Sequence, residues 1–215
     1  MESATYWQQL FTQALRITQR WRAEHTRSEG VLAAAAEFQS RLHLLSRTGP
    51  GAGAGAGTSA PCVLAQLPDA LALLRGKHLR GLENIMAALR ESVAVFASLH
   101  AELAALHVGA RRKHASAPAD APPTLAVVGA GRGTLEQPVL MPPPAQCLRW
   151  VGELDDLFAR ELRLKTALVD GITHDDAAKT QQALHLWRLQ PNLDRAPLER
   201  LHALVGSLSL GAADE

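Results

Sequence analysis

The sequence predicts an all-α protein. Hydrophobic residues make up 47% of the 215 residues but aromatic residues only 4%, so Ala and Leu supply most of the apolar side chains. Ala and Leu lose little conformational freedom in a helix, whereas strands favour the β-branched and aromatic residues that are few here. Apolar residues also recur at steps of three and four over long stretches, as they do on one face of a helix.

The first element is predicted to be one long helix, or a gently broken pair, over residues 5–46. Its apolar or small residues follow a heptad-like seam of the kind found in coiled coils. Glu24 and Ser28 interrupt the seam and Gly30 follows, so we expect a kink or loose turn there. The seam comprises Trp7, Leu10, Ala14, Ile17, Trp21, Val31, Ala35, Phe38, Leu42 and Leu45.

A second long helix is predicted over residues 66–110. The Gly-Ala repeat within residues 48–61 has no side chains to pack and is expected to be a flexible loop. Residues 1–114 are therefore predicted to form a long antiparallel hairpin, with each seam buried against the other or against a partner's helix. The second seam comprises Leu82, Ile85, Leu89, Ser92, Phe96, Leu99, Leu103 and Leu106.

Residues 115–145 are rich in Pro and Gly and are predicted to be a disordered linker. Residues 127–133, Val-Val-Gly-Ala-Gly-Arg-Gly, resemble the start of a dinucleotide-binding loop. Such a loop needs a third glycine where Thr134 stands, and a sheet for which no other strand is expected. The linker interpretation is therefore preferred.

Residues 146–211 are predicted to be a compact module of three helices. The first runs from about residue 145 to residue 172, and residues 173–175 supply a loop and a helix N-cap. The second helix ends at Gln190-Pro191, because proline cannot continue a helix. A turn after the proline then leads into the last helix.

The charge and the cysteines exclude several classes of protein. The chain has 22 Lys and Arg against 21 Asp and Glu, which argues against direct nucleic-acid binding. No basic leader followed by an apolar core is visible, nor an apolar run of about 18 residues, so we expect a soluble intracellular protein with no membrane partner. Cys62 and Cys147 are far apart and form no C-x-x-C, which argues against a disulfide scaffold or a zinc site.

No catalytic or cofactor-binding residue is predicted. No Ser lies in a G-x-S-x-G motif, neither Cys has a nearby His, and the adjacent Asp155 and Asp156 diverge around their helix. His100, His107 and His114 recur every seven residues. No carboxylate or cysteine cluster completes a ligand shell around them, so a solvated helix face is favoured and no metal is expected.

A short basic run, Arg111-Arg112-Lys113-His114, is predicted to end the second long helix. Positive charge is favourable at that end of a helix because it opposes the helix dipole. A weak nuclear localisation element is the alternative interpretation.

The segment from Leu154 to Pro191 holds the candidate protein-binding residues. Glu161 and Lys165 are four residues apart, in the order that favours an ion pair on the helix surface. Trp187 lies at a helix end and is either an anchor for a partner or a plug in the module's own core. The predicted protein-binding residues are Phe158, Glu161, Leu162, Lys165, Trp187, Gln190 and Pro191.

Two runs in this segment, F-A-R-E-L-R-L-K-T-A-L-V and H-L-W-R-L-Q-P, precede a final Leu-rich helix. Together they resemble the cyclin-dependent kinase 2-interacting protein family, most specifically over residues 148–205. Residues 6–21 are also similar to that family's first helix. The positions that match the family's motif are Glu161, Lys165, Trp187, Gln190 and Pro191.

This resemblance implies a non-enzymatic nuclear adaptor. The partners it implies are cyclin-dependent and Cdc7-type kinases, the ATR-partner checkpoint protein, and an AAA ATPase complex. That complex acts in DNA replication and in maturation of the large ribosomal subunit, and its second helical adaptor has a similar W…E…K…W pattern. From the residues alone, the alternative is a structural coiled-coil protein that self-associates through its seams.

Overall fold

The computed structural model describes residues 2–47, 68–116, 125–128 and 137–209. It confirms the all-α fold, to which one pair of short strands is added. All the predicted helices are present, with bounds within a few residues of those predicted. They are α1 (Glu2–Arg47), α2 (Pro68–Ala115), α3 (Pro144–Gly171), α4 (Ala177–Leu189) and α5 (Arg195–Ser209).

Helix α1 is continuous through Gly30, so the loose turn predicted there as the alternative to a kink is wrong. The hydroxyl of Ser28 donates to the backbone carbonyl oxygens of Glu24, at 2.7 Å, and His25, at 3.1 Å. A buried serine that bonds to its own preceding turn can remain inside a helix without breaking it. The polar residues that interrupt the seam therefore belong to the helix.

The chain forms two compact units. Unit 1 consists of Met1–Ala23, Val95–Arg163 and Pro191–Glu215, and unit 2 of Glu24–Ala94 and Leu164–Gln190. Each unit thus takes residues from both the predicted hairpin and the predicted C-terminal module. These units divide the chain differently from the ranges 1–114, 115–145 and 146–211, because the C-terminal helices pack on α1 and α2.

Unit 1 is held together by aromatic side chains from different helices. The Trp21 ring of α1 lies 4.5 Å from the Phe96 ring of α2 and 4.7 Å from the Phe158 ring of α3, centroid to centroid. All three side chains are buried. Helix α5 is joined to α3 by an ion pair between Arg200 and Glu153, with 2.6 Å between nitrogen and oxygen.

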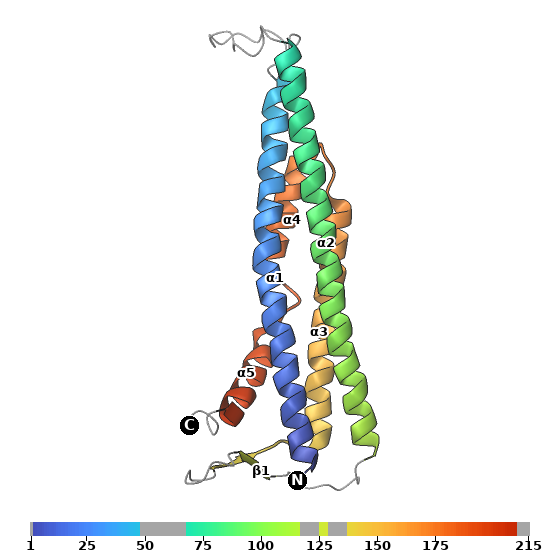
Figure 1. The fold of residues 1–215 in the computed structure, drawn as a ribbon, viewed down its shortest axis with the longest axis vertical. Coiled ribbons are helices and arrows are strands. Elements are labelled where there is room, and N and C mark those ends of the chain that lie inside the picture. Colours follow the sequence, from blue (N-terminus) through green and yellow to red (C-terminus); the bar gives the residue numbers. More distant parts are fainter. Residues whose placement is uncertain (1, 48–67, 117–124, 129–136, 210–215) are drawn as a thin grey trace. The chain divides into compact units, whose positions relative to one another are not determined.

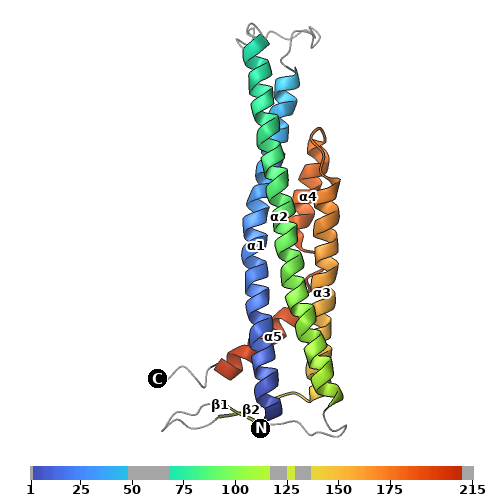
Figure 2. The same ribbon diagram turned by 45° about the vertical axis from the view of Figure 1, so that its right-hand side comes forward.

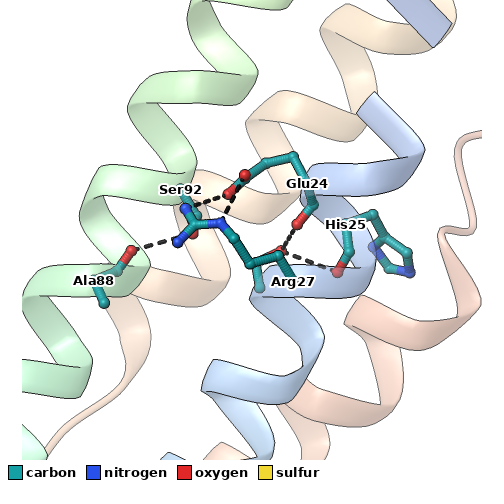
Figure 3. A network of polar contacts seen from close by, with 6 residues as sticks. Glu24, His25, Arg27, Ala88 and Ser92 are labelled. Atoms are coloured by element: carbon teal, nitrogen blue, oxygen red, sulfur yellow. Dashed lines mark hydrogen bonds and ion pairs between the residues drawn. The ribbon is translucent and has the colours of Figure 1, made fainter. Parts of the chain in front are cut away.

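In unit 2 the two long helices run antiparallel, and a polar layer lies between them (Figures 1 and 3). Arg27 of α1 donates to both carboxylate oxygens of Glu24, at 2.8 and 2.9 Å, and to the hydroxyl of Ser92 on α2, at 3.2 Å. Ser92 is fully buried and donates in turn to the carbonyl oxygen of Ala88. The apolar contact between α1 and α2 in unit 2 is therefore interrupted by hydrogen bonds among Glu24, Arg27 and Ser92.

Part of the predicted linker is ordered as two short strands, β1 (Leu125–Val128) and β2 (Gln137–Leu140). They pair antiparallel, with Leu125 opposite Leu140 and Val128 opposite Gln137. The expectation that no second strand exists is wrong, although an antiparallel pair is not the strand–helix–strand unit of a dinucleotide fold. The glycines of residues 129–133 and the Gly-Ala loop at 48–61 lie outside the described residues.

The ends of α4 follow simple capping chemistry. Its N-cap is Asp176, one residue beyond the predicted segment, and the Asp176 side chain accepts a 2.9 Å hydrogen bond from the Lys179 backbone. The helix ends at Leu189, as the proline predicts, and Gln190 takes the left-handed conformation with φ 43°. A left-handed residue is a common helix terminator.

Candidate functional site

The structure places the seven predicted docking residues in different environments. Leu162 and Gln190 are half-buried, and Pro191 is exposed. The other four are buried in the interior of the units: Phe158, Glu161, Lys165 and Trp187. Trp187 therefore occupies the core position that the sequence had left as one of two alternatives.

Lys165 is the centre of a buried polar cluster in unit 2. Its side chain is 0% exposed, and its Nζ lies 3.9 Å from the centroid of the Trp187 ring on α4. The same Nζ is 3.2 Å from Nδ1 of His25 on α1. An ammonium over an indole face is attracted by the electron-rich ring, and more strongly when both groups are removed from water.

His25 completes this cluster as a neutral acceptor. Burial, and then the charge of Lys165, lower the pKa of His25 from 6.5 to about 4, against an opposing effect of Glu29. The imidazole is therefore uncharged near neutral pH, and its Nδ1 accepts the hydrogen bond from Lys165. Glu29 lies 4.0 Å from the other ring nitrogen and accepts a 2.8 Å hydrogen bond from Arg188 of α4. The cluster thus connects α1, α3 and α4.

Glu161 has its own partner in unit 1. Its Oε2 accepts hydrogen bonds of 3.3 Å from the backbone and side-chain nitrogens of Asn192, in the turn after α4. The prediction that Glu161 and Lys165 lie on the helix surface is wrong, since both are 0% exposed. An i, i+4 pair of opposite charges is usual on solvated helices, and nothing in the local sequence indicates that this face of α3 is covered.

A second polar cluster in unit 1 was missed because its carboxylate comes from another helix. Asp155 of α3 lies between two histidines of α2: its Oδ2 is 2.9 Å from Nδ1 of His107, and its Oδ1 is 3.1 Å from Nε2 of His100. The His107 contact has hydrogen-bond geometry, whereas the His100 contact is an ion-pair distance only. The predicted solvated face is therefore wrong for these two histidines.

Within the described parts of the chain, no group of three or more His, Cys, Asp or Glu side chains is arranged to hold a metal ion. The Asp155 carboxylate instead joins α2 to α3 within unit 1.

Cys147 lacks the environment of a reactive thiol. It is buried, and burial raises its pKa to about 12, so the thiol remains protonated. A nucleophilic cysteine needs the opposite shift. Cys62 lies outside the described residues.

Unit 1 also contains a small apolar hollow between α1, α3 and α5. The ≈ 10 Å³ that it leaves for the centre of a water molecule is about the space that one water needs. Its lining residues are Phe11, Trp150, Leu154, Pro197, Arg200 and Leu201.

One helical stretch, Ala72–Ala115 of α2, is long and apolar enough to span a membrane by length and composition alone. A core helix of a helical bundle meets the same two criteria. In its most apolar window 22% of the residues are buried, and the buried apolar residues of the stretch include Leu82, Leu89, Phe96, Leu99 and Leu103.

Comparison with known protein families gives one match. Residues 1–207 match the profile of the CA109-like family, described as "Ribosome biogenesis protein C1orf109-like". The chain belongs to this family. No curated protein matches it significantly.

Membership of the C1orf109-like family corrects the resemblance to the cyclin-dependent kinase 2-interacting protein family, which is wrong. The positions that carried the resemblance include Glu161, Lys165 and Trp187, all of which are buried. Buried residues are determined by how the helices of one chain pack. A similar pattern of such residues in two helical proteins therefore does not identify a shared partner. The role in ribosome maturation agrees with the C1orf109-like family, whereas the kinases and the checkpoint protein lose their support.

Proposed function

We propose that this C1orf109-like protein is a non-enzymatic nuclear adaptor in maturation of the large ribosomal subunit. The observation that carries the proposal is the match of residues 1–207 to a ribosome biogenesis family. A nuclear location is compatible with that role, because ribosomal subunits are largely assembled in the nucleus.

Two features support a binding role over catalysis. Within the Lys165 cluster, Lys165 contacts His25 and Trp187. Within the Asp155 cluster, Asp155 contacts His100 and His107. The Cys147 thiol is held in its protonated form. An active site would instead present such groups to a cleft that can hold a substrate.

The proposed partners are an AAA ATPase and a second helical adaptor. What supports them is the ribosome biogenesis role of the C1orf109-like family, and not the corrected resemblance. The rival function, self-association through the seams, has less support. Leu10 and Ile17 of the first seam and Leu89 and Leu103 of the second are buried within a single chain.

Depletion of the protein from its own cells tests the biological role. We expect free large subunits to fall relative to small subunits on a sucrose gradient, and precursor large-subunit RNA to accumulate. Re-expression of the wild-type chain should restore both. An unchanged gradient after complete depletion would contradict the role in large-subunit maturation.

Affinity purification of the tagged chain, followed by mass spectrometry, tests the partners. We expect an AAA ATPase and a second small helical protein in stoichiometric amounts. Recovery of the tagged chain with only untagged copies of itself would instead support the self-associating alternative.

A further inference from the structure

The end of the α1–α2 hairpin in unit 2 exposes an unusual number of leucines. We define the hairpin end as residues 40–45 of α1 and 69–81 of α2; no side chain described in these ranges is buried. Leucine is among the residues most often buried in proteins. Yet Leu44 is 61%, Leu73 is 73% and Leu79 is 42% exposed. The other described leucines, Leu42, Leu45 and Leu74, are half-buried.

Among the residues that the structure describes, only those of α1 and α2 lie at this end. Gln39 of α1 donates a 2.5 Å hydrogen bond to the carbonyl oxygen of Thr173, at the loop between α3 and α4. Figure 2 shows α1 and α2 extending past that loop. Within the hairpin end, the Arg75 side chain donates to the carbonyl oxygen of Leu45 at 2.6 Å. Nearby, the Phe38 and His78 rings lie 5.6 Å apart. The two helices are thus paired with each other, while Leu44, Leu73 and Leu79 remain exposed.

Positive charge surrounds the exposed leucines. Between Ala70 and Leu82, α2 contains Arg75, Lys77 and Arg80 but no Asp or Glu, although Asp69 and Glu83 flank the stretch. Lys77 and Arg80 are exposed. Across the hairpin, the Glu37 carboxylate is already paired with Arg41 on the same helix.

We propose that the hairpin end binds an acidic amphipathic helix of a partner protein. Exposed leucines on paired helices are usual contacts for an amphipathic helix of a partner. Lys77 and Arg80 would pair with carboxylates on the rim of that helix. At Gly76, an added Cβ would meet no atom within 4 Å, so the partner's backbone can approach closely.

Protein is favoured over RNA as the occupant. Single-stranded RNA is usually held by aromatic side chains that stack on bases, combined with a strongly basic groove. The exposed large hydrophobic side chains described here are leucines. The inference rests on the proposed adaptor function, because it names a surface through which an adaptor would bind.

The test uses the full chain and a fluorescent synthetic peptide with Leu at the a and d positions of three heptads and Glu at the other polar positions. A matched peptide carries Lys in place of each Glu. Fluorescence anisotropy should show that the wild type prefers the acidic peptide. The L73Q/L79Q variant should bind it at least tenfold more weakly. The K77E/R80E variant should lose the acidic peptide and gain the basic one.

Controls come from the opposite end of α2. Val108 is 48% exposed, and Arg111 and Arg112 are exposed next to it. The V108Q and R111E/R112E variants should therefore bind the acidic peptide like the wild type. Circular dichroism should show equal helix content for all variants.

Several results would overturn the proposal. One is that the wild type binds the acidic and basic peptides equally, and another is that it does not bind the acidic peptide at about 100 μM. A third is that the control variants lose as much affinity for the acidic peptide as L73Q/L79Q does. Light scattering that shows self-association lost in L73Q/L79Q would assign the surface to a second copy. Tighter binding of a uridine oligomer, lost in K77E/R80E, would assign it to RNA. If the peptide test fails but depletion still lowers the free large subunits, only this binding surface is rejected and the adaptor role stands.

Discussion

Lys165 places an ammonium group in the interior of unit 2, where a lone charge would be strongly unfavourable. The Trp187 ring and the neutral His25 offset part of that cost, because each presents electron density to the ammonium. Glu161, one turn earlier on α3, accepts hydrogen bonds from the turn after α4. Lys165 therefore helps to fix the positions of α1 and α4, and Glu161 that of the turn after α4.

Replacement of Trp187 should measure its role in the core. We expect Trp187→Ala to lower the free energy of unfolding by about 3–5 kcal/mol, because it leaves a cavity and removes the ring beneath Lys165. Urea unfolding followed by circular dichroism would show this as a lower midpoint. Leu189→Ala, at a position 58% exposed on the same helix, should change the free energy by less than about 0.5 kcal/mol. Equal effects would show that the Trp187 position is not a core position.

His25 should make stability depend on pH. Its pKa of about 4 in the folded protein lies below its usual 6.5, so the unfolded chain takes up a proton first as the pH falls. This contribution is fully present above pH 6.5 and is lost between pH 6.5 and about 4. The loss amounts to about 3 kcal/mol at 1.36 kcal/mol per pKa unit.

His25→Asn provides the measurement for that prediction. Asn retains an acceptor for Lys165 but does not titrate in this range. Urea unfolding at several pH values between 4 and 7 should therefore show a flatter decline for the variant than for the wild type. Parallel curves would mean that His25 does not supply the pH dependence.

At the scale of the helices, α2 contains two glycines in different surroundings. An added Cβ at Gly81 would lie 2.5 Å from Cε1 of Phe38 on α1, whereas one at Gly76 would meet no atom within 4 Å. Gly81 therefore lets α1 and α2 approach each other, while Gly76 costs helix stability with no packing gain in the free chain.

These surroundings predict opposite responses to alanine. Gly76→Ala should stabilise the protein by about 0.5–1 kcal/mol, the helix preference of Ala over Gly. Gly81→Ala should be less favourable than Gly76→Ala by at least about 1 kcal/mol, because the Phe38 ring must move. Thermal unfolding of the two variants beside the wild type would test this. Equal stabilisation would mean that the helices are not closely packed at Gly81.

For the whole molecule, the main feature is that neither compact unit is continuous in sequence. Unit 1 needs Trp21 from α1, Phe96 from α2 and Phe158 from α3. Unit 2 needs His25 from α1 together with Lys165 and Trp187. The C-terminal helices are therefore required by both units.

Separate fragments should not fold independently. We expect neither residues 1–116 nor residues 141–215 to show a cooperative thermal transition alone, because each fragment exposes aromatic side chains that the other one covers. An equimolar mixture should recover helix content and a cooperative transition by circular dichroism. Cooperative unfolding of residues 141–215 alone would instead support the independent C-terminal module predicted from the sequence.

The local sequence by itself determined the helices. Periodicity placed all of them, and Pro191 marked the end of α4, because helix formation and termination depend on neighbours within about one turn. The two strands were missed, since Pro138 and the surrounding glycines are typical of a loop. Only pairing between β1 and β2 reveals them.

The tertiary structure decided what each polar and aromatic residue does. Asp155 and the histidines of α2 are 48 or more residues apart, and His25 and Lys165 are 140 residues apart, so no local pattern joins them. Conversely, Leu73 and Leu79 lie within a helix that the sequence predicted, yet their exposure is known only from the structure. Burial depends on which helices cover a face, and that is a property of long-range packing which periodicity does not encode.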